Sequence, residues 1–220
     1  MPVQLQNAQN AIDSLDRPSI SRYEHYFDSL VPTSTEDRFR RWIFAFASVH
    51  TGWKANCAMY EALAPLDWIG NDELLRRRII DSRAGMHNHR TRYISTFSDT
   101  FWSDHAWFQK DPCESWTECM DRIVKRVLGL GRAKVSFALE LIYFQHAHVV
   151  CADTHFCQMY GITPKQYGAG KVKRSDFDTM EQHWISSCSH ANVSCVTARW
   201  LTFDMKQGHD SPTYWSYVLE

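Results

Sequence analysis

The chain has 220 residues, of which 44% are hydrophobic and 22% are charged, and its formal net charge is −1. This composition is typical of a globular protein and excludes a disordered or fibrous chain. The near-neutral charge also excludes a uniformly basic coat for nucleic acid, so any contact with nucleic acid must be local.

The distribution of cysteines and apolar residues predicts the compartment. Seven cysteines are scattered along the chain, and its first sixteen residues contain no apolar core of the kind found in secretory signals. We therefore expect a reduced intracellular protein, cytoplasmic or associated with the nucleoid, of cellular or phage origin. No apolar run approaches the roughly 20 residues needed to span a bilayer, so we expect no membrane contact. We also expect a monomer.

The pattern of residues predicts helices throughout the chain. Glycine and proline are sparse, and no strand-like runs are joined by Asn-Gly or Asp-Gly. The clearest helix start has Ser34 or Thr33 as its cap, with Glu36 or Asp37 completing a capping box. We expect an all-α fold with helices near 4–15, 20–30, 35–50, 53–64, 71–82, 86–98, 114–127, 132–146, 153–160, 175–187 and 192–206.

Other stretches refine this prediction. Phe39, Trp42, Ile43 and Phe46 follow helical spacing and form one apolar stripe. Residues 101–113 are rich in Trp and Asp and are expected to connect two helices. Residues 161–174 contain three glycines and one proline, which predicts a loop.

Gly129 and Gly131 lie between two of the predicted helices. Glycine permits a positive φ and a close approach of the backbone, and the following helix start presents free N–H groups that can bind a phosphate. A tight turn that only connects the two helices and binds no ligand would explain Gly129 and Gly131 as well. A Rossmann site is excluded, because no strand precedes the glycines and no G-x-G-x-x-G follows.

Asp153 follows the second glycine by about one helix and a short linker. An aspartate before Thr and His is a good N-cap in any protein, so a structural role alone explains it. A fixed carboxylate can also stabilise positive charge that develops on a sugar when its bond to a base is hydrolysed.

These segments resemble the helix-hairpin-helix DNA glycosylase superfamily, the relatives of endonuclease III. The stretches "VLGLGRAKV" and "CADTHFCQMYG" are similar to that family's "L-P-G-V-G-R-K-T-A" hairpin and "V-D-T-H" motif. The family's early helix and "L-S-x-Q-T" turn resemble the stretch "RRWIFAFASVHTGWKANCAMYEAL". Its "G-L-Y-x-x-K-A-x-x-I" stretch resembles "RAGMHNHRTRYI". Its late "H-H-W-L-I-L-H-G" helix resembles "CVTARWLTFDMKQG". The similarity extends in order from about residue 35 to 208.

The resemblance implies one glycosylase-like unit over residues 1–220. It would have two helical lobes, a hairpin at 114–146, a catalytic aspartate loop at 147–155, and double-stranded DNA across a cleft, with the target base flipped out. Asp153 would be the catalytic residue. Residues expected to contact DNA are Gly129, Leu130, Gly131, Arg132, Lys134, His50, Trp53, Asn88 and Arg92, and residues expected to line the base pocket are His50, Tyr143 and His155. Helix-end packing explains His50 and Trp53 as well, a solvent-facing helix explains Asn88 and Arg92, and core packing explains Tyr143.

One departure from the family concerns the reaction. Bifunctional members carry a lysine directly after the hairpin arginine, and Ala133 occupies that position here. Lys134 is next in sequence but lies about 100° further around a helix. We therefore expect a monofunctional enzyme that uses water.

A second departure concerns cofactors. Six residues separate Cys188 from Cys195, as in the first two cysteine ligands of the family's iron–sulfur cluster. No cysteine follows Cys195, and the cluster needs four thiolates. We expect no iron–sulfur cluster and no metal site, while the resemblance allows a monovalent cation at the hairpin. A zinc site from His146, His148, His155 and Cys151 has no supporting motif.

Two other functions remain open at this stage. Phage relatives of this fold are thought to transfer amino acids or amines onto activated hydroxymethyl pyrimidines in DNA, and loss of both the lysine and the cluster fits such a transferase. A non-catalytic DNA-binding protein is the third alternative, in which Asp153 serves only as a helix cap.

Overall fold

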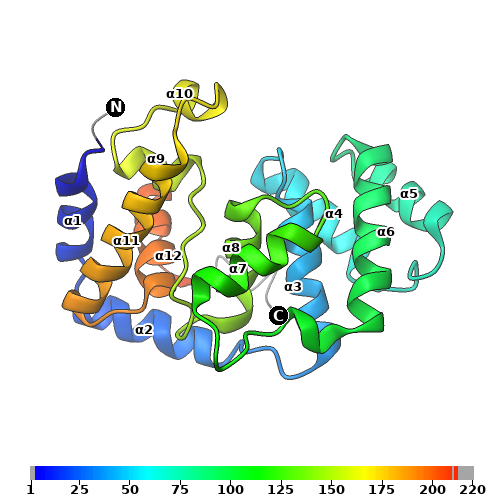
Figure 1. Ribbon diagram of the computed structural model, residues 1–220, viewed down its shortest axis with the longest axis horizontal. Coiled ribbons are helices and arrows are strands. Elements are labelled where there is room, and N and C mark those ends of the chain that lie inside the picture. The colour runs from blue at the N-terminus through cyan, green and yellow to red at the C-terminus, as the bar shows by residue number, and fades with distance from the viewer. Residues whose placement is uncertain (1–2, 210, 213–220) are drawn as a thin grey trace. The chain divides into compact units, whose positions relative to one another are not determined.

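The computed structural model describes residues 3–209 and 211–212, which form twelve α-helices and one 3-10 helix and contain no strand. The expected all-α fold is therefore confirmed (Figure 1). Every helix in these residues is too short or too polar to cross a bilayer. The chain divides into two compact units, one formed by the segment up to Val31 with the segment from Leu139 onward, and the other by Pro32–Ala138.

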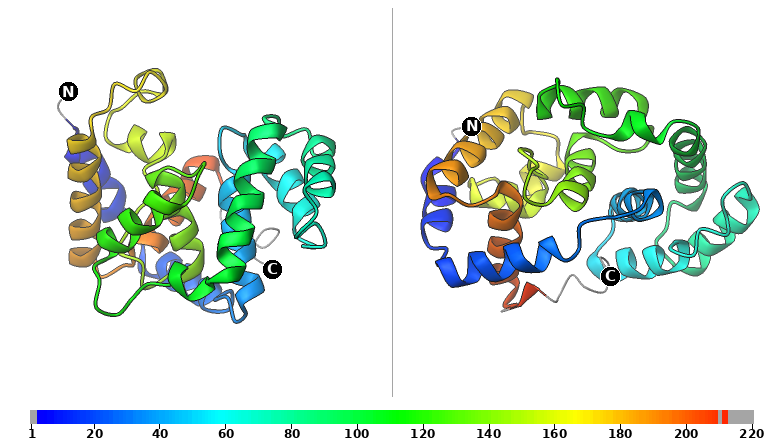
Figure 2. Two further views of the ribbon diagram at one scale, coloured as in Figure 1. Left: turned by 45° about the vertical axis from the view of Figure 1, so that its right-hand side comes forward. Right: turned by 90° about the horizontal axis from the view of Figure 1, so that it is seen from below.

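The first unit is built around a cluster of aromatic rings. Phe27 stacks on Phe144 with ring centroids 4.8 Å apart, and it meets Trp200 edge-on at 4.9 Å. Within this unit α1 packs against α11 and α12, and α2 packs against α12 (Figure 2). Its helices are α1 (Leu5–Asp13), α2 (Arg17–Asp28), α9 (Thr154–Met159), α10 (Pro164–Gly168), α11 (Arg174–Ala191), α12 (Cys195–Gln207) and the end of α8 (Arg132–Tyr143).

The second unit also has an aromatic core. The predicted apolar stripe is confirmed, since Phe39, Trp42, Ile43 and Phe46 are all buried. Phe97 stacks on Phe39 with ring centroids 5.7 Å apart, which joins α6 to α3. The helices of this unit are α3 (Thr35–Ala47), α4 (Trp53–Leu63), α5 (Asp72–Asp81), α6 (His87–Ser103), η1 (His105–Phe108), α7 (Trp116–Arg126) and the start of α8.

Several predicted boundaries were wrong. The α6 helix continues to Ser103, because Phe97 and Phe101 are buried on one face and outweigh the polar residues between them. The predicted connection at 101–113 contains η1, and the predicted loop at 161–174 contains α10. A capping box between Thr163 and Gln166, with Pro164 in the first turn, explains this short helix.

The start of α3 follows the prediction in part. Ser34 is the N-cap, and its hydroxyl accepts a hydrogen bond from the Asp37 N–H at 3.0 Å. The reciprocal half of the predicted capping box does not form, because the carboxylate of Asp37 pairs with Arg40 at 3.1 Å. An acidic side chain in the first turn is still favourable, since it faces the positive end of the helix dipole.

Candidate functional site

The hairpin predicted around Gly129 joins α7 to α8. Gly129 has φ +86°, the left-handed conformation that favours glycine, whereas Gly131 keeps a negative φ and acts as the residue before the helix. The carbonyl of Gly131 accepts hydrogen bonds from the N–H groups of Lys134 at 2.9 Å and Val135 at 3.0 Å. Two glycines therefore have different roles: one permits the turn and the other starts the helix.

The hairpin presents backbone donors to its surroundings. Within the described residues, the N–H groups of Gly129 and Gly131 donate no hydrogen bond. Leu130 is nevertheless buried and anchors the turn, while Leu128 is 55% exposed. An exposed turn with unpaired N–H groups at a helix start can bind an anion such as a phosphate.

The two predicted cations beside the hairpin are engaged within the protein. Arg132 forms an ion pair with Asp121 of α7, which ties the two helices of the hairpin together. The ammonium of Lys134 lies over the ring of Phe137 at 5.5 Å from its centroid. Both side chains are half-buried rather than fully exposed.

The α6 helix places Arg92 and Tyr93 next to the hairpin. The ring of Tyr93 lies against Gly129, where a side chain on residue 129 would collide with it. The exposed guanidinium of Arg92 lies 5.0 Å from the centroid of that ring and donates to the Tyr93 hydroxyl at 3.3 Å. Asn88, one turn earlier, is also exposed, but its side-chain oxygen accepts a hydrogen bond from Arg76 at 3.1 Å.

The predicted turn at His50 lies between α3 and α4. His50 is exposed and adopts φ +54°, which is uncommon for a residue with a side chain. Trp53 begins α4, is half-buried, and packs edge-on against Phe44 at 5.8 Å. Of this predicted pair, His50 is the more accessible to a ligand.

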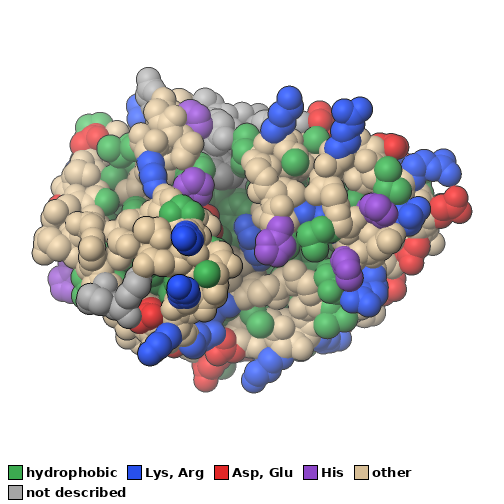
Figure 3. Space-filling view, turned by 90° about the horizontal axis from the view of Figure 1, so that it is seen from above, with side chains coloured by type: hydrophobic (Ala, Val, Ile, Leu, Met, Phe, Trp, Pro, Cys, Tyr) green, Lys and Arg blue, Asp and Glu red, His purple; other side chains and the backbone are tan. Residues whose placement is uncertain are grey.

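Arg90 connects α6 to the His50 turn. This buried guanidinium donates hydrogen bonds to the backbone carbonyls of Phe46 at 2.9 Å and Val49 at 2.5 Å. Burial lowers the pKa of Arg90. In this unit one helix therefore contacts both predicted DNA-binding turns, the His50 turn through Arg90 and the hairpin through Tyr93. Figure 3 shows Lys, Arg and His side chains on the right-hand side of the view, where α4 to α6 lie, with Asp and Glu side chains among them at the outer edge.

Asp153 lies in the other unit, as the N-cap of α9. Its Oδ1 accepts a hydrogen bond from the Phe156 N–H at 2.9 Å, and its Oδ2 lies 3.8 Å from Nη1 of Arg199. The side chain remains 26% exposed. The carboxylate is thus held at both oxygens and still reaches the surface.

The two predicted pocket residues of this unit differ in exposure. His155, in the first turn of α9, is exposed and packs edge-on against Phe203 at 5.2 Å. Tyr143, the last residue of α8, is half-buried. No three His, Cys, Asp or Glu side chains within residues 3–209 and 211–212 are grouped as metal ligands.

Two buried charged residues next to Asp153 were not predicted from the sequence. Glu140 of α8 and Arg199 of α12 are buried and bonded to each other, with Arg199 Nη2 2.5 Å from Glu140 Oε2. They are 59 residues apart, so spacing could not have paired them. A glutamate within the apolar run "SFALELIYF" was the only signal, because a buried charge needs a partner.

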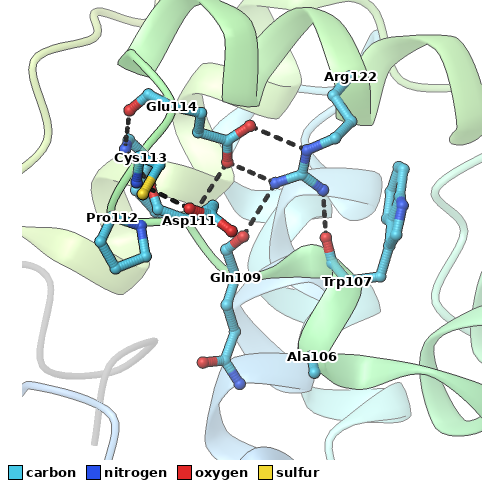
Figure 4. Close-up of a pocket in the computed structure, with 9 residues that line it drawn as sticks. Ala106, Trp107, Gln109, Asp111, Pro112, Cys113, Glu114 and Arg122 are labelled. Carbon is cyan, nitrogen blue, oxygen red and sulfur yellow. Dashed lines mark hydrogen bonds and ion pairs between the residues drawn. The ribbon is translucent and has the colours of Figure 1, made fainter.

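A cavity of about 650 Å³ lies beside the connection from α6 to α7 and contains no predicted site residue. Arg122 donates to both Glu114 oxygens and to the carbonyls of Trp107 and Gln109 (Figure 4). Hydrogen bonding to Arg122 lowers the pKa of Glu114 to about 2. These polar groups are satisfied within the connection itself, so we assign it a structural role.

Comparison with solved structures identifies the fold. No protein-family model matches the chain, and no curated protein matches its sequence. The chain is similar to the crystal structure of an 8-oxoguanine DNA glycosylase from Methanocaldococcus jannaschii, with a TM-score of 0.70, 13% identity, and coverage of 93% of this chain and 94% of that one.

A second structure from the same organism is an 8-oxoguanine glycosylase/lyase in complex with a 15mer DNA containing 8-oxoguanine. It matches with a TM-score of 0.67, 13% identity, and coverage of 93% of this chain and 97% of that one. Such coverage at low identity establishes a shared fold rather than a shared substrate. The chain therefore shares its all-helical fold with these two archaeal 8-oxoguanine DNA glycosylase structures.

Proposed function

We propose that this protein is a monofunctional DNA glycosylase that flips a modified or mispaired base out of double-stranded DNA and hydrolyses its N-glycosidic bond. The observation that carries the proposal is the carboxylate of Asp153, which is fixed at both oxygens and still 26% exposed. Cleavage of the bond between sugar and base develops positive charge on the sugar, and a preorganised carboxylate stabilises that charge or orients the attacking water.

The contacts with DNA would come from the second unit. The unpaired N–H groups of the hairpin around Gly129 would bind a phosphate of the strand that carries the target base. The exposed guanidinium of Arg92 would bind a further phosphate, and His50 would enter the opened duplex. A solved structure of similar fold is a complex with DNA, which supports DNA as the ligand.

The residue after Arg132 favours hydrolysis over a lyase reaction. Ala133 cannot form a Schiff base with the sugar, and the ammonium of Lys134 lies over the ring of Phe137, 5.5 Å from its centroid. Water is therefore the nucleophile in the proposed reaction. This differs from the second archaeal relative, which is described as a glycosylase/lyase.

The proposal is tested by weighing the products formed from lesion-bearing duplexes, with 8-oxoguanine opposite cytosine as the first substrate. Release of a free base with an intact abasic strand supports a monofunctional glycosylase. Strand cleavage at the abasic site without added base or heat would contradict the monofunctional assignment. If no base is released but an activated hydroxymethyl pyrimidine gains the mass of a supplied amine, the protein is a transferase instead. Salt-sensitive binding with no product would indicate a non-catalytic DNA-binding protein.

Two N-cap aspartates of the same unit provide a matched pair of variants. Asp16 caps α2 by accepting a hydrogen bond from the Ser19 N–H at 2.8 Å, just as Asp153 caps α9. Asparagine is as good an N-cap as aspartate, so both helices should remain intact in Asp153→Asn and Asp16→Asn. Only Asp153→Asn should abolish base release, while both variants should keep DNA affinity within about threefold.

A further inference from the structure

We propose that Arg199 and Glu140 act as positioning residues that fix the carboxylate of Asp153 for the reaction. This inference rests on the proposed function, because it gives a role to two residues that would not touch the substrate. It is carried by the contacts among three charged side chains from α8, α12 and the N-cap of α9. We call these side chains the Glu140–Arg199–Asp153 network.

The two inner members of the network are removed from solvent. The side chain of Glu140 is 0% exposed and that of Arg199 is 6% exposed. Arg199 Nε lies 2.9 Å from both carboxylate oxygens of Glu140, and Nη2 lies 2.5 Å from Oε2. The planar guanidinium thus engages Glu140 along one edge, which leaves Nη1 directed to Asp153 at 3.8 Å.

Glu140 also fixes the backbone that leads to Asp153. Its Oε1 accepts a hydrogen bond from the Cys151 N–H at 2.6 Å, two residues before the aspartate. The Asp153 N–H in turn donates to the Cys151 carbonyl at 2.7 Å. The network therefore restrains both the main chain and the side chain of Asp153, and the Phe156 N–H restrains its other oxygen.

A role in stability alone does not explain the network. Removing two charges from water costs several kcal/mol per ion, and replacement of a buried ion pair by well-packed apolar residues is often neutral or stabilising. Although burial opposes it, the negative charge of Glu140 raises the pKa of Arg199, so the guanidinium stays charged. A fixed cation beside a partly exposed carboxylate would serve catalysis, since it holds that carboxylate in one orientation before substrate arrives.

The choice of arginine matters to this arrangement. A guanidinium has five N–H donors in a fixed plane and can bind Glu140 and face Asp153 at the same time. A lysine ammonium is a single point charge and cannot span both carboxylates in the same geometry. Arg199→Lys therefore keeps the charge while removing the ability to position Asp153.

The catalytic test compares Arg199→Lys with Tyr23→Phe. Tyr23 of α2 donates a buried hydrogen bond at 2.8 Å to Asp204, which lies on α12 as Arg199 does. Tyr23→Phe therefore controls for the loss of a buried polar contact near the network. Single-turnover rates of base release and DNA dissociation constants would be measured at a temperature where thermal melting shows both variants to be folded. We expect Arg199→Lys to lower the rate by about tenfold or more with the dissociation constant unchanged, and Tyr23→Phe to keep the rate within about twofold.

A second test needs no catalysis and uses amide hydrogen exchange of the free protein. The Phe156 N–H donates to the Asp153 side chain, whereas the Cys157 N–H donates to the Asp153 backbone carbonyl at 2.9 Å. If Arg199 holds the side chain, Arg199→Lys should speed exchange at Phe156 by about tenfold and leave exchange at Cys157 unchanged. Tyr23→Phe should not change the exchange rate of the Phe156 amide relative to that of the Cys157 amide.

The two tests separate the failure of this inference from the failure of the proposed function. If the wild-type protein releases no base, the proposed function fails. The exchange rate of the Phe156 amide in Arg199→Lys, compared with that of Cys157, still decides whether Arg199 positions Asp153. If the wild type is active but Arg199→Lys retains full rate and ordinary protection at Phe156, the positioning role is overturned. Equal loss of rate in Arg199→Lys and Tyr23→Phe would likewise overturn it, because a general loss of packing would then explain both.

Discussion

The ring of Tyr93 occupies the space beside Gly129 that a side chain on residue 129 would need. A Cβ on residue 129 would lie 2.4 Å from Cδ2 of that ring, and the backbone there has φ +86°. The turn therefore requires glycine for two independent reasons, its backbone conformation and its contact with α6.

Substitution of Gly129 by alanine should damage both stability and DNA binding. We expect Gly129→Ala to lower the free energy of unfolding by roughly 1–3 kcal/mol, because a non-glycine residue is strained at this φ and collides with Tyr93. Gly131→Ala is the matched control for stability, since a Cβ at residue 131 meets no atom of the protein within 4 Å. Urea unfolding and DNA titration would check both variants. Equal loss of stability in the two alanine variants would contradict this account.

Arg90 should be essential for the His50 turn. Its guanidinium donates to the carbonyls of Phe46 and Ala47 at the end of α3, to that of Val49 just after it, and to that of Gly85. A lysine cannot reproduce this fork, so Arg90→Lys should lose about 2–3 kcal/mol of stability in urea unfolding. The control is Arg92→Lys on the same helix, which should stay within about 0.5 kcal/mol because the side chain is exposed. A loss for Arg92→Lys as large as that for Arg90→Lys would argue against the role of Arg90.

The ion pair of Glu114 with Arg122 should make stability depend on acidic pH. The pKa of Glu114 is lowered from 4.5 to about 2, chiefly by hydrogen bonding to Arg122. Because the folded pKa is the lower one, this stabilisation is present above pH 4.5 and is lost as the pH falls through about 2. Glu114→Gln should therefore be less stable than the wild type at about pH 6, and the difference should shrink toward about pH 2.

The measurement for this prediction is thermal unfolding across that pH range. Glu73→Gln provides the control, since its carboxylate is 86% exposed and pairs with Arg77 only at the surface. Surface pairs of this kind contribute little, so Glu73→Gln should follow the wild type at every pH. A pH-independent difference between Glu114→Gln and the wild type would show that lost packing, rather than lost charge, causes the effect.

Arg92 should contribute one phosphate contact to DNA binding. We expect Arg92→Gln to weaken binding and to reduce the slope of log affinity against log salt by about 1, since each neutralised phosphate releases condensed counterions. Titrations between about 0.05 and about 0.2 M salt would measure this slope. Arg22→Gln, an exposed change on α2, should leave the slope unchanged. An unaltered slope in Arg92→Gln would exclude a phosphate contact by this residue.

Much of the fold follows from local signals in the sequence. Ser34 as a cap and the stripe from Phe39 to Phe46 predict α3, because capping and periodic burial act over a few residues. The short helix α10 escaped prediction although Thr163 and Gln166 form its capping box, since nearby glycines indicated a loop. Local signals thus predict where helices occur better than where they end.

The candidate site was predicted less completely, for a physical reason. Motif similarity indicates Asp153 and the hairpin, because those residues are close in sequence to recognisable neighbours. Glu140 and Arg199 lie 59 residues apart, and only folding brings them together. The contact of Tyr93 with Gly129 is likewise made between two elements and leaves no mark on local spacing.

The burial of Glu140 and Arg199 has a consequence for how this protein can diverge. Loss of either partner alone would leave the other's charge buried and unpaired. Such a change commonly lowers the free energy of unfolding by about 3–5 kcal/mol, about as much as a small domain can tolerate. Positions 140 and 199 should therefore change together or not at all during descent. A lineage that lost Asp153 could replace all three side chains by apolar ones. The identities of residues 140, 153 and 199 together would therefore distinguish active homologues from inactive ones.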